Sequence, residues 1–286
     1  MSLELLVGLD DLATERQLTS GWSVVALPLG EASRFSAKAA ALLPTGMTEF
    51  HAATFNSSDA ASRKAYTDFL SLLRTAAESG PGSLLATTLN NKSWHTSLTT
   101  FADKFVPTIL AGQGIVDQAV IQGAADAAPS LFTLVRLLDS HPGSALLRRL
   151  EMDKNTKTGR FAIQNLAVRG VSLLAPDLLA ILVNGYRNQL FPLSPAISPS
   201  GIVVVDSASS FLVQGADVLG NFSLNYLIRS LGPTTPGRTK KAEIFEHVFH
   251  DVLPQTQFGT LASLDPQTLE LALNNPGALT FRVEPV

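Results

Sequence analysis

The sequence predicts an α/β protein whose helices flank a mixed β-sheet. Short runs of β-branched and other apolar residues alternate along the chain with longer segments of helical periodicity, a pattern typical of α/β layer folds. The first two strand candidates follow each other closely enough to pair as an antiparallel hairpin, so the sheet should contain both parallel and antiparallel strands. With 286 residues, of which 45% are apolar and 16% charged, the chain can bury a substantial core.

The first half of the chain carries three strand candidates and two helical segments. The strand candidates are the apolar runs 3–9, 22–29 and 83–89. Residues 31–43 are rich in alanine and helical in character. A second helix is indicated by a stripe of apolar residues at helical spacing, formed by Tyr66, Phe69, Leu70, Leu73 and Ala77. Helices therefore separate the opening hairpin from the third strand.

The second half is expected to contain further helices and three more strands. Helical segments are expected up to about His141 and across 161–190, 242–252 and 265–273. Strand candidates are found at 145–152, 202–205 and 279–283. Strands and helices thus continue to alternate along the chain.

The chain changes character after Leu231. The stretch GPTTPGRTKK has the composition of a linker, and we therefore divide the chain into a core, 1–231, and a C-terminal extension, 232–286. The extension is expected to pack on or beside the core. Because it is apolar and poor in charge, it could also bury itself against a partner or a second copy, so we include a homo-oligomer among the expected states.

The composition excludes several classes of site. The chain has no cysteine, which excludes disulfides, thiolate metal sites, iron–sulfur clusters and cysteine nucleophiles. A formal net charge of −3 gives no basic excess of the kind that marks nucleic-acid binders, so any phosphate binding has to be local. The first residues lack the basic segment of a secretory signal, and Pro176 and Asp177 interrupt the most apolar later stretch. We therefore expect a cytoplasmic protein without membrane spans.

Acidic residues occur where a metal site in an α/β fold would need them. Phosphodiester hydrolysis with Mg²⁺ or Mn²⁺ requires several carboxylates at one place, because these hard cations prefer oxygen ligands. Four places qualify, at strand ends, before a helix or on a helix that follows a strand: Asp10 with Asp11, Glu49, Asp153 and Asp217.

The helix expected after 202–205 carries a stripe of polar residues. Gln214, Asp217, Asn221 and Asn225 are spaced three and four apart and so share one face. The opposite face is apolar and carries Leu212, Ala216, Leu219 and Leu227. A polar stripe without Lys, Arg or Glu is less typical of a solvated surface than of a functional face.

One segment resembles the signature of the domain-of-unknown-function-3800 family. In that signature a strand ends on Asp-Ser and the next helix begins with Gln-x-Ala-Asp, and DSASSFLVQGADVLG is similar to it. The matching positions are Asp206, Ser207, Gln214, Ala216 and Asp217.

Three further segments resemble elements of the same family, in the same order. TEFHA is similar to its acid–x–histidine element, which gives Glu49 and His51. LLVGLDDLAT occupies the place of an opening strand with Asp-Glu-Ser, so Asp10 and Asp11 match its two acids, with aspartate in place of the glutamate. LEMDKNT resembles a later strand that ends on an acid, here Asp153.

The resemblance covers about 3–231 and implies a ribonuclease-H-like core with metal-dependent phosphodiester chemistry. The residues implied to be catalytic and to hold Mg²⁺ or Mn²⁺ are Asp10, Glu49, Asp153 and Asp217. The candidate substrate-binding residues are His51, Gln214, Asn221 and Lys154. Lys154 belongs to a basic loop beside Asp153 and could contact the backbone of a nucleic acid, the partner that this chemistry implies.

A second hypothesis is a ribonuclease-H-like module that binds an unknown partner without catalysis. The altered opening motif, the net negative charge and the apolar extension favour it. Structural roles also remain open for the acids. Asp10, Asp11 and Asp153 could be turn residues, Asp217 could stabilise a helix N-terminus, and Asp206 could cap a helix.

Overall fold

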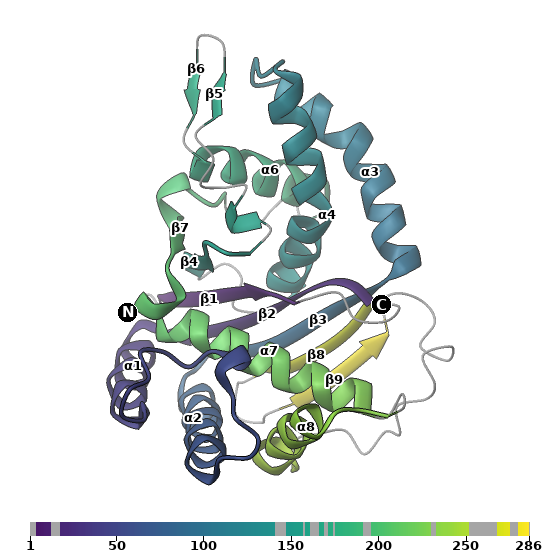
Figure 1. Cartoon of the computed structure of the whole chain (residues 1–286). Coiled ribbons are helices and arrows are strands. Elements are labelled where there is room, and N and C mark those ends of the chain that lie inside the picture. The colour runs from purple at the N-terminus through teal and green to yellow at the C-terminus, as the bar shows by residue number, and fades with distance from the viewer. Residues whose placement is uncertain are drawn as a thin grey trace.

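One β-sheet lies between two groups of helices in the computed structural model (Figure 1). The residues that the structure describes are 4–12, 18–140, 147–156, 158–160, 166–168, 171–173, 175–190, 196–229, 233–251, 268–274 and 280–285. Within these ranges, no helix is both long enough and apolar enough to cross a bilayer. The mixed sheet and its flanking helices confirm the predicted α/β class.

Seven strands form the main sheet, in the order β7–β4–β1–β2–β3–β8–β9. Their bounds are Leu5–Asp11 (β1), Leu18–Pro28 (β2), Leu84–Asn91 (β3), Leu147–Asp153 (β4), Ile202–Val205 (β7), Thr268–Asn274 (β8) and Thr280–Pro285 (β9). Strands β1, β2 and β3 are antiparallel, whereas β4 pairs parallel with β1 and β7 pairs parallel with β4. Strands β8 and β9 extend the sheet beyond β3 with antiparallel pairs. The carboxyl ends of β1, β4 and β7 therefore meet at one edge.

Helices cover both faces of the sheet (Figure 1). One face carries α3 (Lys92–Ala111), α4 (Gln118–Ser140) and α6 (Ala175–Leu190). The other face carries α1 (Leu29–Leu42), α2 (Ala60–Ser79), α7 (Phe211–Arg229) and α8 (Pro236–Phe249). Alternate residues of the central strands divide between two apolar cores: Val7 and Leu9 pack with the α3 group, whereas Val25 and Leu27 pack with the α7 group.

Helix α7 packs so closely on the sheet that backbone atoms of the helix and of β1 are in contact. A Cβ atom on Gly8 of β1 would lie 2.3 Å from the carbonyl carbon of Leu212, at the start of α7. A Cβ atom on Gly220 of α7 would lie 2.6 Å from the Cβ atom of Ser23 on β2. Glycine at both positions therefore allows the helix to approach the sheet more closely than any side chain would permit.

Polar side chains and proline fix the start of two helices. Asp59 accepts the N–H groups of Ala61 and Ser62 at the first turn of α2. Thr235 accepts the N–H of Arg238, and proline at the first position of α8 already has a helical φ. Helix α8 therefore begins at Pro236 rather than at residue 242, and part of the predicted linker is helical.

One other prediction about an element was wrong, and a second, that 161–190 is mostly helical, is confirmed only in part. The segment predicted as a helix at 265–273 contains strand β8, because pairing with β3 outweighs its helix-forming composition. Its leucines at 269, 271 and 273 alternate with other residues, which is a strand pattern. Within 161–190, α6 is helical, but Leu166–Val168 (β5) and Val171–Leu173 (β6) form a hairpin whose valines favour strands.

The C-terminal extension adds one helix to the helical layer around α7 and two strands to the main sheet. Helix α8 packs against α7 and α2, and its buried Phe245 and Phe249 belong to the same apolar core as Phe222 of α7. Strand β8 pairs with β3 of the main sheet. Residues of the extension are thereby brought next to α7, the helix that carries the polar stripe.

Candidate functional site

Three neighbouring parallel strands end on or just before aspartate. Strand β1 ends with Asp10 and Asp11, β4 ends with Asp153, and Asp206 follows β7 directly. In the parallel register Leu9 lies beside Met152, and Asp153 lies beside Val205. Asp10 and Asp153 consequently occupy neighbouring positions at one edge of the sheet.

Asp10 and Asp153 lie on the α7 face of the sheet. Gly8 of β1 contacts α7, and side chains two residues apart on a strand share a face, so Asp10 faces the same way. On β4, Glu151 accepts a 2.6 Å hydrogen bond from Ser210, the residue that precedes α7. Asp153 follows two residues later, on the side where Asp217 projects from α7.

The carboxylates of Asp10, Asp153 and Asp217 act on one another electrostatically. Burial raises the pKa of Asp10 well above its ordinary value of 3.8, and the negative charges of Asp217, Asp11 and Asp153 raise it further. Carboxylates that lie close together without a balancing cation make one another harder to ionise. The site thus has a surplus of negative charge at the strand ends.

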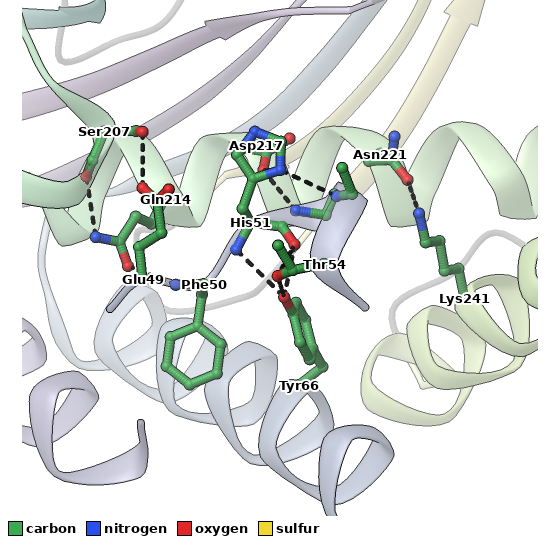
Figure 2. A network of polar contacts seen from close by, with 12 residues as sticks. Glu49, Phe50, His51, Thr54, Tyr66, Ser207, Gln214, Asp217, Asn221 and Lys241 are labelled. Carbon is green, nitrogen blue, oxygen red and sulfur yellow. Dashed lines mark hydrogen bonds and ion pairs between the residues drawn. The ribbon is translucent and has the colours of Figure 1, made fainter. Parts of the chain in front are cut away.

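Asp217 is also linked to the segment that precedes α2. Its Oδ2 atom accepts the N–H of Ala52 at 2.7 Å, and the Nδ1 atom of His51 lies 3.7 Å away (Figure 2). Burial raises the pKa of Asp217, and the negative charge of Asp153 raises it further. The hydrogen bond from the Ala52 N–H and the charges of His51 and Lys241 lower the same pKa. His51 Nδ1 accepts the Ala53 N–H, so in the neutral imidazole this atom has no proton to donate to Asp217.

Gln214 holds two backbone segments together at the start of α7. This side chain is fully buried, and its Oε1 atom accepts the Phe50 N–H at 3.0 Å, while its Nε2 atom donates to the Ser207 carbonyl at 2.9 Å. The Ser207 hydroxyl in turn donates to Glu49 at 2.8 Å (Figure 2). Gln214 therefore positions Glu49 through the main chain and lies too deep to contact a substrate itself.

Tyr66 of α2 supports the same segment from below. Its hydroxyl donates to the His51 carbonyl at 2.6 Å and lies 2.9 Å from the Thr54 hydroxyl. Its ring packs against Phe50 and Phe222. The sequence placed Tyr66 only in an apolar stripe, because helical spacing reveals a buried face but not the partner of a hydroxyl group.

The two remaining candidates lie at the edges of the site. Lys154 is exposed and forms an ion pair with Asp206, which also caps a short 3₁₀ helix, Ser207–Ser209, by accepting the Ala208 N–H. Asn221 accepts a hydrogen bond from Lys241 of α8 at 2.8 Å. Lys241 was missed because its segment was assigned to a linker; the signal that could have found it is its place one helical turn before the buried Phe245.

The donor chemistry fits Mg²⁺ or Mn²⁺, but the carboxylates are not arranged as a finished metal site. The candidate ligands are carboxylates, the oxygen donors that these hard cations prefer, and a bound cation would relieve the repulsion around Asp10. Among the residues that the structure describes, however, no three His, Asp or Glu side chains are grouped so that they could hold a metal ion. Binding would therefore require the side chains to approach one another.

Replacing Gln214 with methionine should lower the free energy of unfolding by about 1–3 kcal/mol, because it leaves the buried Phe50 N–H unpaired and removes one of the two hydrogen bonds that the Ser207 carbonyl accepts. Thermal or urea unfolding measures the change. The matched control is Gln122→Met on α4, where the exposed amide bonds only to the exposed Asp126 and the change should be near zero. Equal stability of the two variants would contradict the positioning role of Gln214.

Comparison with known proteins identifies no relative: no family model, no curated protein and no solved structure matches the chain. Any assignment of function therefore depends on the chemistry of the strand-end carboxylates and their surroundings.

Proposed function

We propose that the protein is a divalent-metal-dependent phosphodiesterase that acts on nucleic acid and has a ribonuclease-H-like core. The observation that carries the proposal is the mutual repulsion of Asp10, Asp153 and Asp217 at the edge where parallel strands end. Buried carboxylates that repel one another cost stability, and a cation-dependent reaction gives a reason for them. The edge beyond the carboxyl ends of strands is also where α/β folds commonly bind ligands.

The sheet supports the ribonuclease-H-like part of the proposal. The five strands β3, β2, β1, β4 and β7 combine an antiparallel meander with two parallel strands on the far side of β1. Helices cover both faces, and α7 packs along the face of the sheet against β1 and β2 (Figure 1). This arrangement is compatible with the order in which the motifs follow one another in the sequence.

Four carboxylates would form the metal site. Asp10, Asp153 and Asp217 would bind Mg²⁺ or Mn²⁺. Glu49, which is oriented by the hydrogen bond from the Ser207 hydroxyl, would be the fourth ligand. Such a cation would activate water and stabilise the leaving oxygen of a phosphodiester.

The groups around the carboxylates would bind and orient the substrate. His51, half exposed beside Asp217, and the exposed Lys154 would contact the substrate, whereas Gln214 would orient the Glu49 segment. Because the net charge of the whole chain is −3, these local groups have to supply the attraction for phosphate.

Replacing Asp217 with asparagine should lower Mn²⁺-dependent cleavage of a labelled oligonucleotide by at least about 100-fold, the scale on which one charged group acts in catalysis. The asparagine oxygen can still accept the Ala52 N–H, so the fold should persist. Cleavage is followed by gel electrophoresis, with EDTA to remove the metal, and Asp68→Asn on the surface of α2 is the matched control. Undiminished cleavage by the Asp217 variant would overturn the assignment.

We keep a binding module without catalysis as the second proposal, because one observation favours it. Asp217 and Gln214 already bond to the main chain, and the described carboxylates form no finished metal site. A folded wild-type protein that shows no Mn²⁺-dependent cleavage would favour this proposal. Gel filtration with light scattering would then show whether the partner is a second copy.

A further inference from the structure

Lys241 brings a cation from the C-terminal extension to the polar stripe of α7. Its Nζ atom donates to Asn221 Oδ1 at 2.8 Å (Figure 2). The same atom lies 5.9 Å and 5.7 Å from the ring centroids of Phe55 and Phe222. Asn221 is one helical turn beyond Asp217, so the ammonium group lies next to the carboxylate cluster. Lys241 also acts electrostatically on Asp217.

The surroundings of Lys241 leave part of its hydrogen-bonding capacity available. An ammonium group has three donors, and within the described chain Lys241 donates one hydrogen bond, to a neutral amide oxygen. Lys241 is half-buried and its ammonium group lies over the rings of Phe55 and Phe222; burial lowers the pKa of the group, while the charge of Asp217 opposes this. Burying a cation without a bonded carboxylate is costly, which favours a role in binding an anion.

The orientation of the Asn221 amide follows from its neighbours. Both Lys241 Nζ and Asn225 Nδ2 donate to the same atom of Asn221, which therefore has to be its oxygen. The NH₂ group of Asn221 then points away from Lys241, as Figure 2 shows. The pair thus offers two kinds of donor, the ammonium of Lys241 and, on the far side of the Asn221 carboxamide, its NH₂ group.

We propose that Lys241 and Asn221 form a phosphate-binding subsite that holds a phosphodiester of a nucleic-acid strand beside the carboxylate cluster. The proposal rests on the proposed function, which it deepens by assigning a group that positions the backbone of the substrate. An ammonium next to carboxylates suits a phosphate there, because it offsets the negative charge that the carboxylates add.

The test measures binding of fluorescein-labelled oligothymidylate by fluorescence anisotropy, in EDTA and over a series of salt concentrations. Lys241→Met removes the charge and keeps the length of the stem, so affinity should fall by about tenfold. The slope of log K against log salt should become shallower by about 0.7, the value for one phosphate contact on a single strand. Lys241→Arg should retain the slope of the wild type.

Lys240→Met is the matched control, because Lys240 is the neighbouring residue on α8 and is exposed and paired with Glu243. Its slope should equal that of the wild type. If Lys241→Met does not fold, Lys241→Gln provides a second neutral variant with the same expected slope.

An unchanged slope for the neutral Lys241 variants, or no binding by the wild type, overturns the subsite. Because EDTA removes metal, the binding assay is independent of the cleavage assay. If the neutral Lys241 variants give a shallower slope but the wild type does not cleave, the proposed activity is contradicted and the phosphate-binding subsite is supported.

Discussion

Replacing Asp10 with asparagine is expected to abolish metal-dependent cleavage and, at the same time, to stabilise the folded protein at neutral pH. The Asp10 carboxylate has to ionise against burial and against the charges of Asp217, Asp11 and Asp153, whereas asparagine of the same shape carries no charge. We expect a gain of about 0.5–2 kcal/mol in the free energy of unfolding, typical of a single stabilising substitution. Cleavage should fall by at least about 100-fold.

The pH dependence of this gain has a defined sign. The pKa of Asp10 is higher in the folded chain than its ordinary value of 3.8, so the folded state binds more protons between those two values. Wild-type stability from this group is therefore complete below pH 3.8 and is lost as pH rises through the folded pKa. The difference between Asp10→Asn and the wild type should be small in acid and should grow toward neutral pH.

Urea unfolding at a series of pH values measures this difference, and Asp68→Asn serves as the control at an exposed acid. Mn²⁺ should stabilise the wild type and narrow its gap to the Asp10 variant. A variant that is less stable than the wild type at every pH would show that the Asp10 carboxylate is not repelled by its neighbours.

Replacing Gly8 with alanine is expected to cost about 3 kcal/mol or more, because overpacking typically costs about 1–3 kcal/mol and here the obstacle is backbone. The added Cβ atom would lie 2.3 Å from the carbonyl carbon and 2.4 Å from the carbonyl oxygen of Leu212, neither of which can rotate away. Strand β1 and helix α7 would have to separate, which would carry Asp10 away from Asp217.

Gly215→Ala on α7 is the matched control for this prediction. A Cβ atom there would meet Val25 and Leu73 at 3.5 Å and 3.6 Å, which is ordinary contact, and alanine is the better helix former by about 1 kcal/mol. Thermal unfolding should therefore give shifts of opposite sign for the two glycine-to-alanine changes. Equal and small shifts would mean that α7 adjusts its distance from the sheet easily.

The strands and their acidic ends could be predicted from the sequence because both depend on local patterns. Short apolar runs identified the strands that end near Asp10 and Asp153, and polar spacing identified the stripe on α7. The wrong element was β8, whose residues favour a helix when taken alone and form a strand because β3 offers them a partner.

The inner arrangement of the site could not be predicted because it depends on contacts between distant parts of the chain. The bonds from Phe50, Ala52 and Ser207 to their partners join residues between 158 and 165 positions apart. The place of Lys241 depends likewise on the packing of α8 against α7. No local pattern encodes such distances, so the sequence predicted the carboxylates but not what holds them.

The glycine contacts of α7 determine which part of the site can move. Because Gly8 and Gly220 bring the helix to backbone distance of the sheet, Asp10 and Asp217 belong to one rigid body. The backbone around Glu49 is also fixed, by the Phe50 and Ala52 N–H groups that donate to α7 and by the buried ring of Phe50. The Glu49 carboxylate, by contrast, is held by one hydrogen bond, from the Ser207 hydroxyl, which can open alone. Induced fit around a bound ligand would therefore be carried by the Glu49 side chain, which would move toward a fixed pair of carboxylates.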